Sequence, residues 1–152
     1  MAPAVGDEAP DFELPDQHGQ TVRLSALRGH KAALVVFYPW AFSRVCGSEL
    51  DALQDRIDEV VTDDVELLTI SCDPTFALRA YADQKGFSFP LLSDFWPHGA
   101  VASAYGVLDQ AVGIALRGSF LVDKNGVLRW SVVQGIPDAR DIDDYKKAIA
   151  DL

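Results

Sequence analysis

The sequence is poor in cysteine and histidine, and both shortages limit the classes of function that the protein can have. Among 152 residues there are two cysteines, Cys46 and Cys72, and three histidines. The cysteines form no Cys-x-x-Cys pair and follow no zinc-ligand spacing, which disfavours a dithiol reductase and a structural metal site. We therefore expect no metal and no cofactor.

Positive charge and long apolar runs are also scarce. There are 13 Lys and Arg residues against 23 acidic residues, a formal net charge of −10. Such a surface repels phosphate and anionic lipid, so we expect neither a nucleic-acid nor a membrane partner. The longest apolar run, residues 32–42, contains Pro39 and is shorter than the roughly 20 residues of a membrane-spanning helix. The opening residues lack a secretory signal, which predicts a cytoplasmic location.

The order of apolar patterns predicts an α/β fold in a single domain over residues 1–152. Near-continuous apolar runs at 32–38 and 65–71 are typical of central strands buried on both faces. Hairpins are expected at 12–24 and 118–133, a short strand at 91–92, and helices at 43–60, 74–86, 97–106 and 142–152. This order resembles the thioredoxin-like fold, a central mixed β-sheet flanked by helices, here with an N-terminal β-hairpin.

Cys46 lies between the first central strand and the helix that follows it. Unpaired N–H groups and the positive end of the helix dipole stabilise a thiolate there, and the thiolate is the nucleophilic form of cysteine. Ser43 is the expected N-cap, with its hydroxyl in reach of the sulfur, and Pro39 is placed to shield it from water. Glu49 would disfavour a thiolate unless it holds a cation. The alternative is a cysteine buried as a small apolar side chain.

Four motifs, in order along the chain, resemble those of the peroxiredoxin family. The central one is Pro39-x-x-x-Ser43-x-x-Cys46, with Glu49 three residues further on. The segment 94–99, Asp-Phe-Trp-Pro-His-Gly, and the short C-terminus are similar to those of the one-cysteine alkyl hydroperoxide reductase E group. The resemblance covers essentially the whole chain. The other three motifs are Ala9-Pro10-Asp11-Phe12, Phe89-Pro90-Leu91-Leu92-Ser93-Asp94 and Arg117-Gly118-Ser119-Phe120-Leu121-Val122-Asp123.

The resemblance implies a role for each matching residue. Cys46 would be the peroxidatic cysteine, Ser43 its hydrogen-bonding partner, and Arg117 the active-site arginine oriented by Glu49, with Pro39 shielding the pocket. Ser43 departs from the family's more frequent threonine, keeping the hydroxyl but losing the methyl group that restricts the rotamer.

The reaction implied is thiol-dependent reduction of hydrogen peroxide, alkyl hydroperoxides or peroxynitrite. The thiolate becomes a sulfenic acid, which an external thiol reduces. The external thiol would be a small molecule or a glutaredoxin-like or thioredoxin-like protein. The resemblance also implies a homodimer.

Other readings stay open at this point. Cys72 ends the second central strand, at the same sheet edge as Cys46, so it is either a resolving cysteine of a two-cysteine peroxidase or a buried residue without a redox role. A redox-sensing or partner-binding protein with little turnover is a further alternative. Arg44 is an alternative cation for the sulfur, whereas Arg129 is expected on a solvated face.

Aromatic residues and one histidine near these motifs have two interpretations each. Trp40 and Phe42 either pack in the core or form an apolar collar for alkyl peroxides. Phe95 and Trp96, in a loop, indicate an interface if they are exposed. His98 is expected to cap a helix or contribute to an interface rather than act as a base, because a thiolate needs no further deprotonation.

Overall fold

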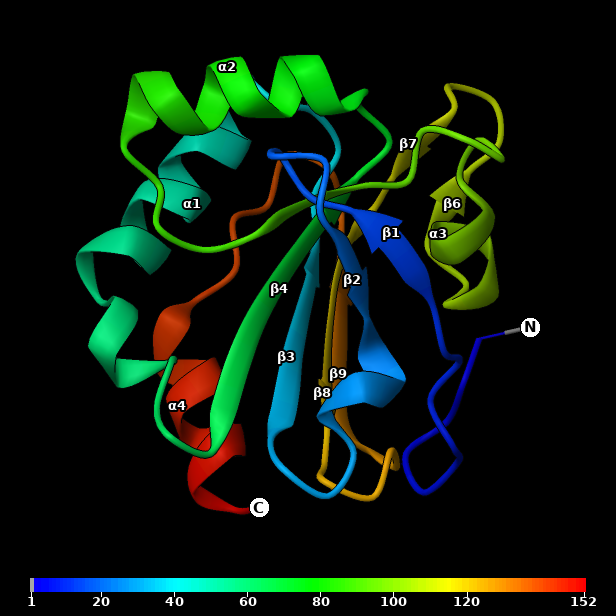
Figure 1. Cartoon of the computed structure of the whole chain (residues 1–152), viewed down its shortest axis with the longest axis vertical. Coiled ribbons are helices and arrows are strands. Elements are labelled where there is room, and N and C mark those ends of the chain that lie inside the picture. Colours follow the sequence, from blue (N-terminus) through cyan, green and yellow to red (C-terminus); the bar gives the residue numbers. More distant parts are fainter. Residues whose placement is uncertain (1) are drawn as a thin grey trace.

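The computed structural model describes residues 2–152 and has a five-stranded mixed sheet at its centre (Figure 1). The strand order is β5-β4-β3-β8-β9. Three strands run parallel: β3 (Ala32–Phe37), β4 (Val65–Ser71) and β5 (Leu91–Ser93). β8 (Arg117–Val122) is antiparallel to β3, and β9 (Leu128–Gln134) is antiparallel to β8. The thioredoxin-like mixed sheet is confirmed.

Each face of the sheet has its own apolar core. The first core lies under α1 (Arg44–Asp55), α2 (Thr75–Lys85) and α4 (Ile142–Ala150). The second lies under the N-terminal hairpin and α3 (Ala100–Ala104). In Figure 1 the helices α1 and α4 lie on one side of the sheet, with α3 on the other. Side chains of β4 alternate between the two cores, since Leu67 belongs to the first and Leu68 to the second.

The expected hairpins are present, with ends shifted by a residue or two. The N-terminal hairpin pairs β1 (Glu13–Pro15) with β2 (Thr21–Arg23) and leads into the 3₁₀ turn η1 (Leu24–Leu27). A third antiparallel pair, β6 (Leu108–Asp109) with β7 (Ile114–Ala115), was not expected. Strands of two residues are too short to show an alternating apolar pattern.

The helix expected over 43–60 is shorter than its apolar spacing indicates. α1 ends at Asp55, and a separate 3₁₀ turn, η2 (Ile57–Glu59), follows. Arg56 leaves the helical conformation between them, with φ −115° and ψ 29°, and its guanidinium pairs with Glu59 and Asp143. Val60 nevertheless stays buried in the first core, so the apolar spacing is satisfied by two segments rather than one.

The other helices are close to expectation. α2 begins after Pro74 and ends where Gly86 adopts a left-handed φ of +74°, a conformation that suits glycine. The helices expected at 97–106 and 142–152 are confined to Ala100–Ala104 and Ile142–Ala150. Over residues 2–152 no helix has the length and apolar character needed to cross a membrane.

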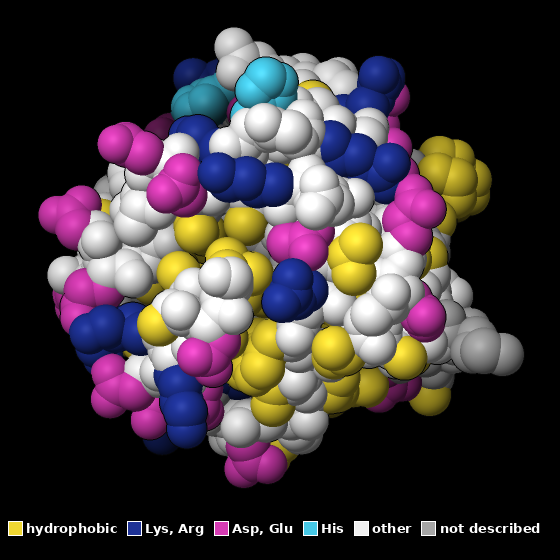
Figure 2. Space-filling view, turned by 90° about the horizontal axis from the view of Figure 1, so that it is seen from below, with side chains coloured by type: hydrophobic (Ala, Val, Ile, Leu, Met, Phe, Trp, Pro, Cys, Tyr) yellow, Lys and Arg dark blue, Asp and Glu magenta, His cyan; other side chains and the backbone are white. Residues whose placement is uncertain are grey.

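The parallel strands of the sheet all end beneath α2, which leaves their opposite ends and the connecting turns at the other pole of the molecule. Seen from that pole, acidic and basic side chains are interspersed around a smaller apolar area (Figure 2). Ion pairs at these turns include Lys124–Asp64 and Arg28–Glu8. The net negative charge is therefore mixed with positive charge here.

Candidate active site

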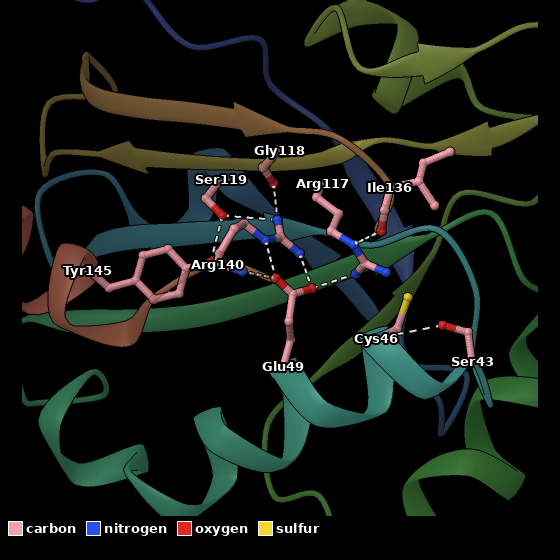
Figure 3. Close-up of polar contacts among 9 residues, drawn as sticks. All are labelled: Ser43, Cys46, Glu49, Arg117, Gly118, Ser119, Ile136, Arg140 and Tyr145. Atoms are coloured by element: carbon pink, nitrogen blue, oxygen red, sulfur yellow. Dashed lines mark hydrogen bonds and ion pairs between the residues drawn. The ribbon is translucent and has the colours of Figure 1, made fainter. Parts of the chain in front are cut away.

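Cys46 is the third residue of α1 and is fully buried. Ser43, in extended conformation, caps the helix, and its Oγ accepts a hydrogen bond from the Cys46 N–H at 3.2 Å. The predicted N-cap is thereby confirmed. The sulfur of Cys46 points toward the guanidinium of Arg117 (Figure 3). The sulfur thus belongs to the first turn of a twelve-residue helix, where backbone N–H groups lack intrahelical acceptors.

The loop between β3 and α1 is held in one conformation by Asp73. Asp73 Oδ2 accepts the Ala41 N–H at 2.8 Å and the Ser71 hydroxyl at 2.7 Å. Pro39 is buried at the start of this loop. Phe42 near its end has a positive φ of 67°, which is strained for a residue with a side chain. The loop that leads into the Cys46 helix is therefore fixed by hydrogen bonds and locally strained.

Arg117 is 1% exposed and is fixed by two acceptors. Its Nη1 donates to Glu49 Oε1 at 2.5 Å, and its Nε donates to the Ile136 carbonyl at 2.5 Å. Among the described residues its Nη2 has no protein acceptor, and this end of the guanidinium lies over Cys46 in Figure 3. The geometry therefore leaves one charged donor available at the sulfur.

Gly118 lets the strand carrying Arg117 pack closely against its neighbours. A Cβ at this position would lie 2.7 Å from Cγ1 of Val107, closer than real side chains approach. The Gly118 carbonyl in turn accepts a hydrogen bond from Arg140 Nη1 at 2.9 Å. The absence of a side chain at 118 thus lets β8 lie close to Val107, while the backbone carbonyl of the same residue holds Arg140.

Arg140 is the functional residue that the sequence analysis missed. Its backbone N–H and its Nε donate to Glu49 Oε2 at 2.6 and 2.8 Å, and its Nη2 donates to Glu49 Oε1 at 2.9 Å. Arg140 directly precedes Asp141, the N-cap of α4. No apolar period or short motif marks this position. An arginine just before a helix cap was the only available signal.

The buried ion cluster carries an excess positive charge. Two guanidinium groups, Arg117 and Arg140, share the single carboxylate of Glu49, so the three side chains sum to +1. Burial alone would raise the pKa of Glu49, but the hydrogen bonds and charge of Arg140, with the charge of Arg117, lower it instead. Because an uncompensated buried charge is costly, a thiolate at Cys46 would balance the cluster.

Cys72 is close to the end of β4 but belongs to the other face of the sheet. It directly follows β4 and lies beside the backbone of Ala115, a residue of the second core, whereas Cys46 lies in the first. Burial, Asp94 and Asp73 raise the pKa of the Cys72 thiol to about 12. Both cysteines are free thiols. The expected shared edge is real, but the two side chains lie on opposite faces.

Arg44 lies away from the Arg117 cluster. It is exposed and lines an open groove of about 350 Å³ between α1 and α2, together with Gly47, Tyr81 and Lys85. In the described part of the chain it forms no ion pair, whereas Arg129 pairs at the surface with Asp123 at 3.2 Å. The cation facing the sulfur is therefore Arg117.

Several aromatic side chains are exposed at the sheet edge that carries Cys46. Trp40 and Phe42 follow β3, whereas Phe95 and Trp96 follow β5, and Trp96 is 80% exposed. The ring nitrogens of His98 contact the carbonyl oxygens of Phe95 at 3.1 Å and Gly113 at 2.6 Å. His98 thus ties two loops together and is not a helix cap.

A buried cysteine at a helix N-terminus, facing an oriented guanidinium on a thioredoxin-like sheet, defines a protein built for thiol redox chemistry. Comparison with known proteins gives the family. The sequence profile of the AhpC/TSA family matches residues 5–131. Alkyl hydroperoxide reductase E of Mycobacterium tuberculosis is 47% identical over 148 residues, which cover 97% of each protein.

Solved structures agree with this assignment. The reduced 2-Cys peroxiredoxin of Plasmodium vivax gives a TM-score of 0.88 at 31% identity, covering 97% of this chain and 81% of that one. Peroxidoxin BcpB of Mycobacterium tuberculosis gives 0.85 at 29% identity, covering 97% of both chains. The chain therefore belongs to the AhpC/TSA family of peroxiredoxins, and it is a thiol-dependent peroxidase.

Proposed function

We propose that Cys46 is the peroxidatic cysteine and that Arg117 is its charged partner. The thiolate attacks the terminal peroxide oxygen, so that an S–O bond forms as the O–O bond breaks, leaving Cys46 as a sulfenic acid. The departing oxygen takes up a proton and leaves as water from hydrogen peroxide or as an alcohol from an alkyl hydroperoxide, whereas peroxynitrite releases nitrite. The observation that carries this proposal is the unshared Nη2 of Arg117 over a fully buried sulfur.

The surrounding residues have distinct parts in this step. Arg117 Nη2 and the first-turn N–H groups of α1 stabilise negative charge as it moves from sulfur to the leaving oxygen. Glu49 orients Arg117, and Ser43 holds the helix start with its Oγ one turn from the sulfur. Pro39 closes the β3 side of the pocket against water.

The substrates proposed are hydrogen peroxide, alkyl hydroperoxides and peroxynitrite. All three present an O–O bond to the thiolate. Trp40 and Phe42 are exposed beside the Cys46 helix and provide an apolar rim for the chain of an alkyl hydroperoxide.

The catalytic cycle is a one-cysteine cycle that ends on an external thiol. A thiol attacks the sulfenic acid to form a mixed disulfide with loss of water, and a second thiol then releases Cys46. The neutral Cys72 thiol, on the opposite face of the sheet, supports this cycle over a two-cysteine cycle. The reductant is a small thiol or a glutaredoxin-like or thioredoxin-like protein, a supply that fits the reducing cytoplasm.

Steady-state peroxide consumption tests the cycle. Purified protein is mixed with hydrogen peroxide and either a small thiol or a thioredoxin or glutaredoxin system. We expect Cys72→Ser to keep wild-type turnover and Cys46→Ser to abolish it. Loss of turnover in Cys72→Ser as well as in Cys46→Ser would instead establish a two-cysteine enzyme.

The exposed aromatic residues support a homodimer across the Cys46 edge. They come from the ends of three parallel strands or the segments that follow them, and large apolar side chains exposed together mark interfaces. The set consists of Trp40, Phe42, Phe76, Phe95 and Trp96. Sedimentation analysis should show a dimer for the wild type and a monomer for Trp96→Glu, with Val133→Glu, at another exposed apolar site, as the control.

A further inference from the structure

Tyr145, in the C-terminal helix α4, is joined to the Cys46 site by a continuous chain of hydrogen bonds (Figure 3). Its side chain is 2% exposed, and its hydroxyl lies 2.8 Å from Ser119 Oγ. Ser119 Oγ also accepts a hydrogen bond from Arg140 Nη1 at 3.0 Å. From Arg140 the chain continues through Glu49 to Arg117.

The strand β8 explains why Ser119 and Arg117 meet the same cluster. Side chains two residues apart on a strand point to the same face, so both point toward α1. Leu121, the next residue in this series, lies in the first core, whereas Phe120 lies in the second. Ser119 is therefore a buried polar contact built into the face of the sheet that carries the ion cluster.

The Ser119 hydroxyl is one of the points that fix the plane of Arg140. Arg140 Nη1 is held by the Gly118 carbonyl and Ser119 Oγ, while its other donors face Glu49. A serine hydroxyl turns freely about its side-chain bond, but contact with a buried tyrosine hydroxyl restricts it. Tyr145 therefore limits the tilt of the guanidinium that holds Glu49.

We propose that Tyr145 is a positioning residue for Cys46 and that it acts through Arg140. The proposal depends on the role of Cys46 proposed above. Through Ser119, the hydroxyl of Tyr145 holds the plane of the Arg140 guanidinium in a fixed orientation toward Glu49. Glu49 then holds Arg117 with its free donor over the sulfur. The seating of α4 on the sheet is thereby transmitted to the reacting atom without any contact between α4 and substrate.

Two conservative variants test this chain. Tyr145→Phe removes one hydroxyl and keeps the ring that packs against Trp130. Ser119→Ala removes the hydroxyl that connects Tyr145 to Arg140. Tyr105→Phe is the matched control, since Tyr105 is a buried tyrosine of the other core whose hydroxyl donates to the Pro10 carbonyl.

Two readouts separate positioning from general stability. One is the rate of Cys46 oxidation by hydrogen peroxide in stopped flow. The other is the pH profile of Cys46 alkylation, resolved from Cys72 by peptide mass. We expect Tyr145→Phe and Ser119→Ala each to slow oxidation about fivefold and to move the alkylation midpoint to higher pH. The double variant should equal Ser119→Ala, because both changes break one chain.

The control and the alkylation profile decide the outcome. Tyr105→Phe should keep the wild-type oxidation rate within about twofold, even if its melting temperature falls as much as that of Tyr145→Phe. A wild-type rate and alkylation profile in Tyr145→Phe would overturn the proposal, as would equal slowing in Tyr105→Phe. Failure of the wild type to react with peroxide would overturn the role of Cys46 instead. The alkylation profiles of the variants would still show whether the hydrogen bonds from Tyr145 affect the Cys46 thiol.

Discussion

Arg140 donates three hydrogen bonds to the carboxylate of Glu49, through its backbone amide at 2.6 Å, its Nε at 2.8 Å and its Nη2 at 2.9 Å. The same carboxylate accepts Arg117 Nη1. Glu49 is therefore the centre of the buried cluster, and it is one helical turn from Cys46 in α1. A change at Glu49 should alter both the stability of the protein and the chemistry of the sulfur.

Replacing Glu49 with glutamine should destabilise the protein strongly. The variant leaves two buried guanidinium groups without a counter-charge, which costs about 3–5 kcal/mol in the free energy of unfolding. Urea unfolding measures this loss. Glu59→Gln is the control, because Glu59 is an exposed glutamate that also meets two cations, Arg56 and Lys146, and should change stability little. Equal losses in both variants would contradict the account.

Acid should remove the contribution of Glu49. Its folded pKa lies below the ordinary value of 4.5, because hydrogen bonds and positive charge outweigh the effect of burial. The stability it contributes is thus fully present above the unfolded pKa and is lost as the pH falls through the folded pKa. Urea midpoints measured from about pH 7 down to about pH 3 should fall more steeply in the wild type than in Glu49→Gln. Parallel curves would disprove the linkage.

Removing the guanidinium of Arg117 should slow the oxidation of Cys46 by roughly a hundredfold or more, the usual effect of deleting one oriented donor. Arg117→Lys should recover only part of the rate, because lysine lacks the fork that serves Glu49 and the sulfur together. Stopped-flow oxidation by hydrogen peroxide gives these rates. Arg44→Ala changes an exposed arginine in the same helix turn as Cys46, and this variant should react normally. A large loss there, with none in Arg117→Ala, would make Arg44 the cation.

Ser43 should matter first as a helix cap. Ser43→Ala loses the acceptor for the Cys46 N–H, a cost of about 1 kcal/mol that lowers the melting temperature by roughly 2–4 °C. Ser43→Thr should restore it. Thermal unfolding followed by circular dichroism measures the change. Ser48→Ala is the control, since Ser48 is exposed in the same helix and its hydroxyl makes no hydrogen bond among the described residues. A melting temperature unchanged in Ser43→Ala would argue against the cap.

The sequence predicted the frame of the molecule well because its central strands and helices carry regular apolar patterns. β3 and β4 are near-continuous apolar runs, and α2 is bounded by Pro74 and Gly86. The β6–β7 pair and the break at Arg56 escaped prediction for a local reason. Two-residue strands have no period, and the break keeps Ile57 and Val60 on the apolar face.

The candidate site was predictable where its residues sit in short motifs. Ser43, Cys46 and Glu49 follow one another at intervals of three residues, about one helical turn each, and Arg117 begins a recognisable strand motif. Arg140 and Tyr145 escaped because their contacts span sequence separations of 91 and 26 residues, respectively. Long-range hydrogen bonds of this kind depend on how α4 docks against the sheet. Arg140 stands in no local pattern, and the helical spacing of Tyr145 predicts only that it lies on the apolar face of the C-terminal helix.

The most direct test of the central claim is the intact mass of the reduced protein after one equivalent of hydrogen peroxide, with a sulfenic-acid trap present. The account predicts a trapped adduct on Cys46, with Cys72 still a free thiol. Loss of two hydrogens without an adduct would mean that Cys46 and Cys72 pair, which contradicts the one-cysteine cycle. No change at either cysteine would contradict the assignment of Cys46 as the peroxidatic residue.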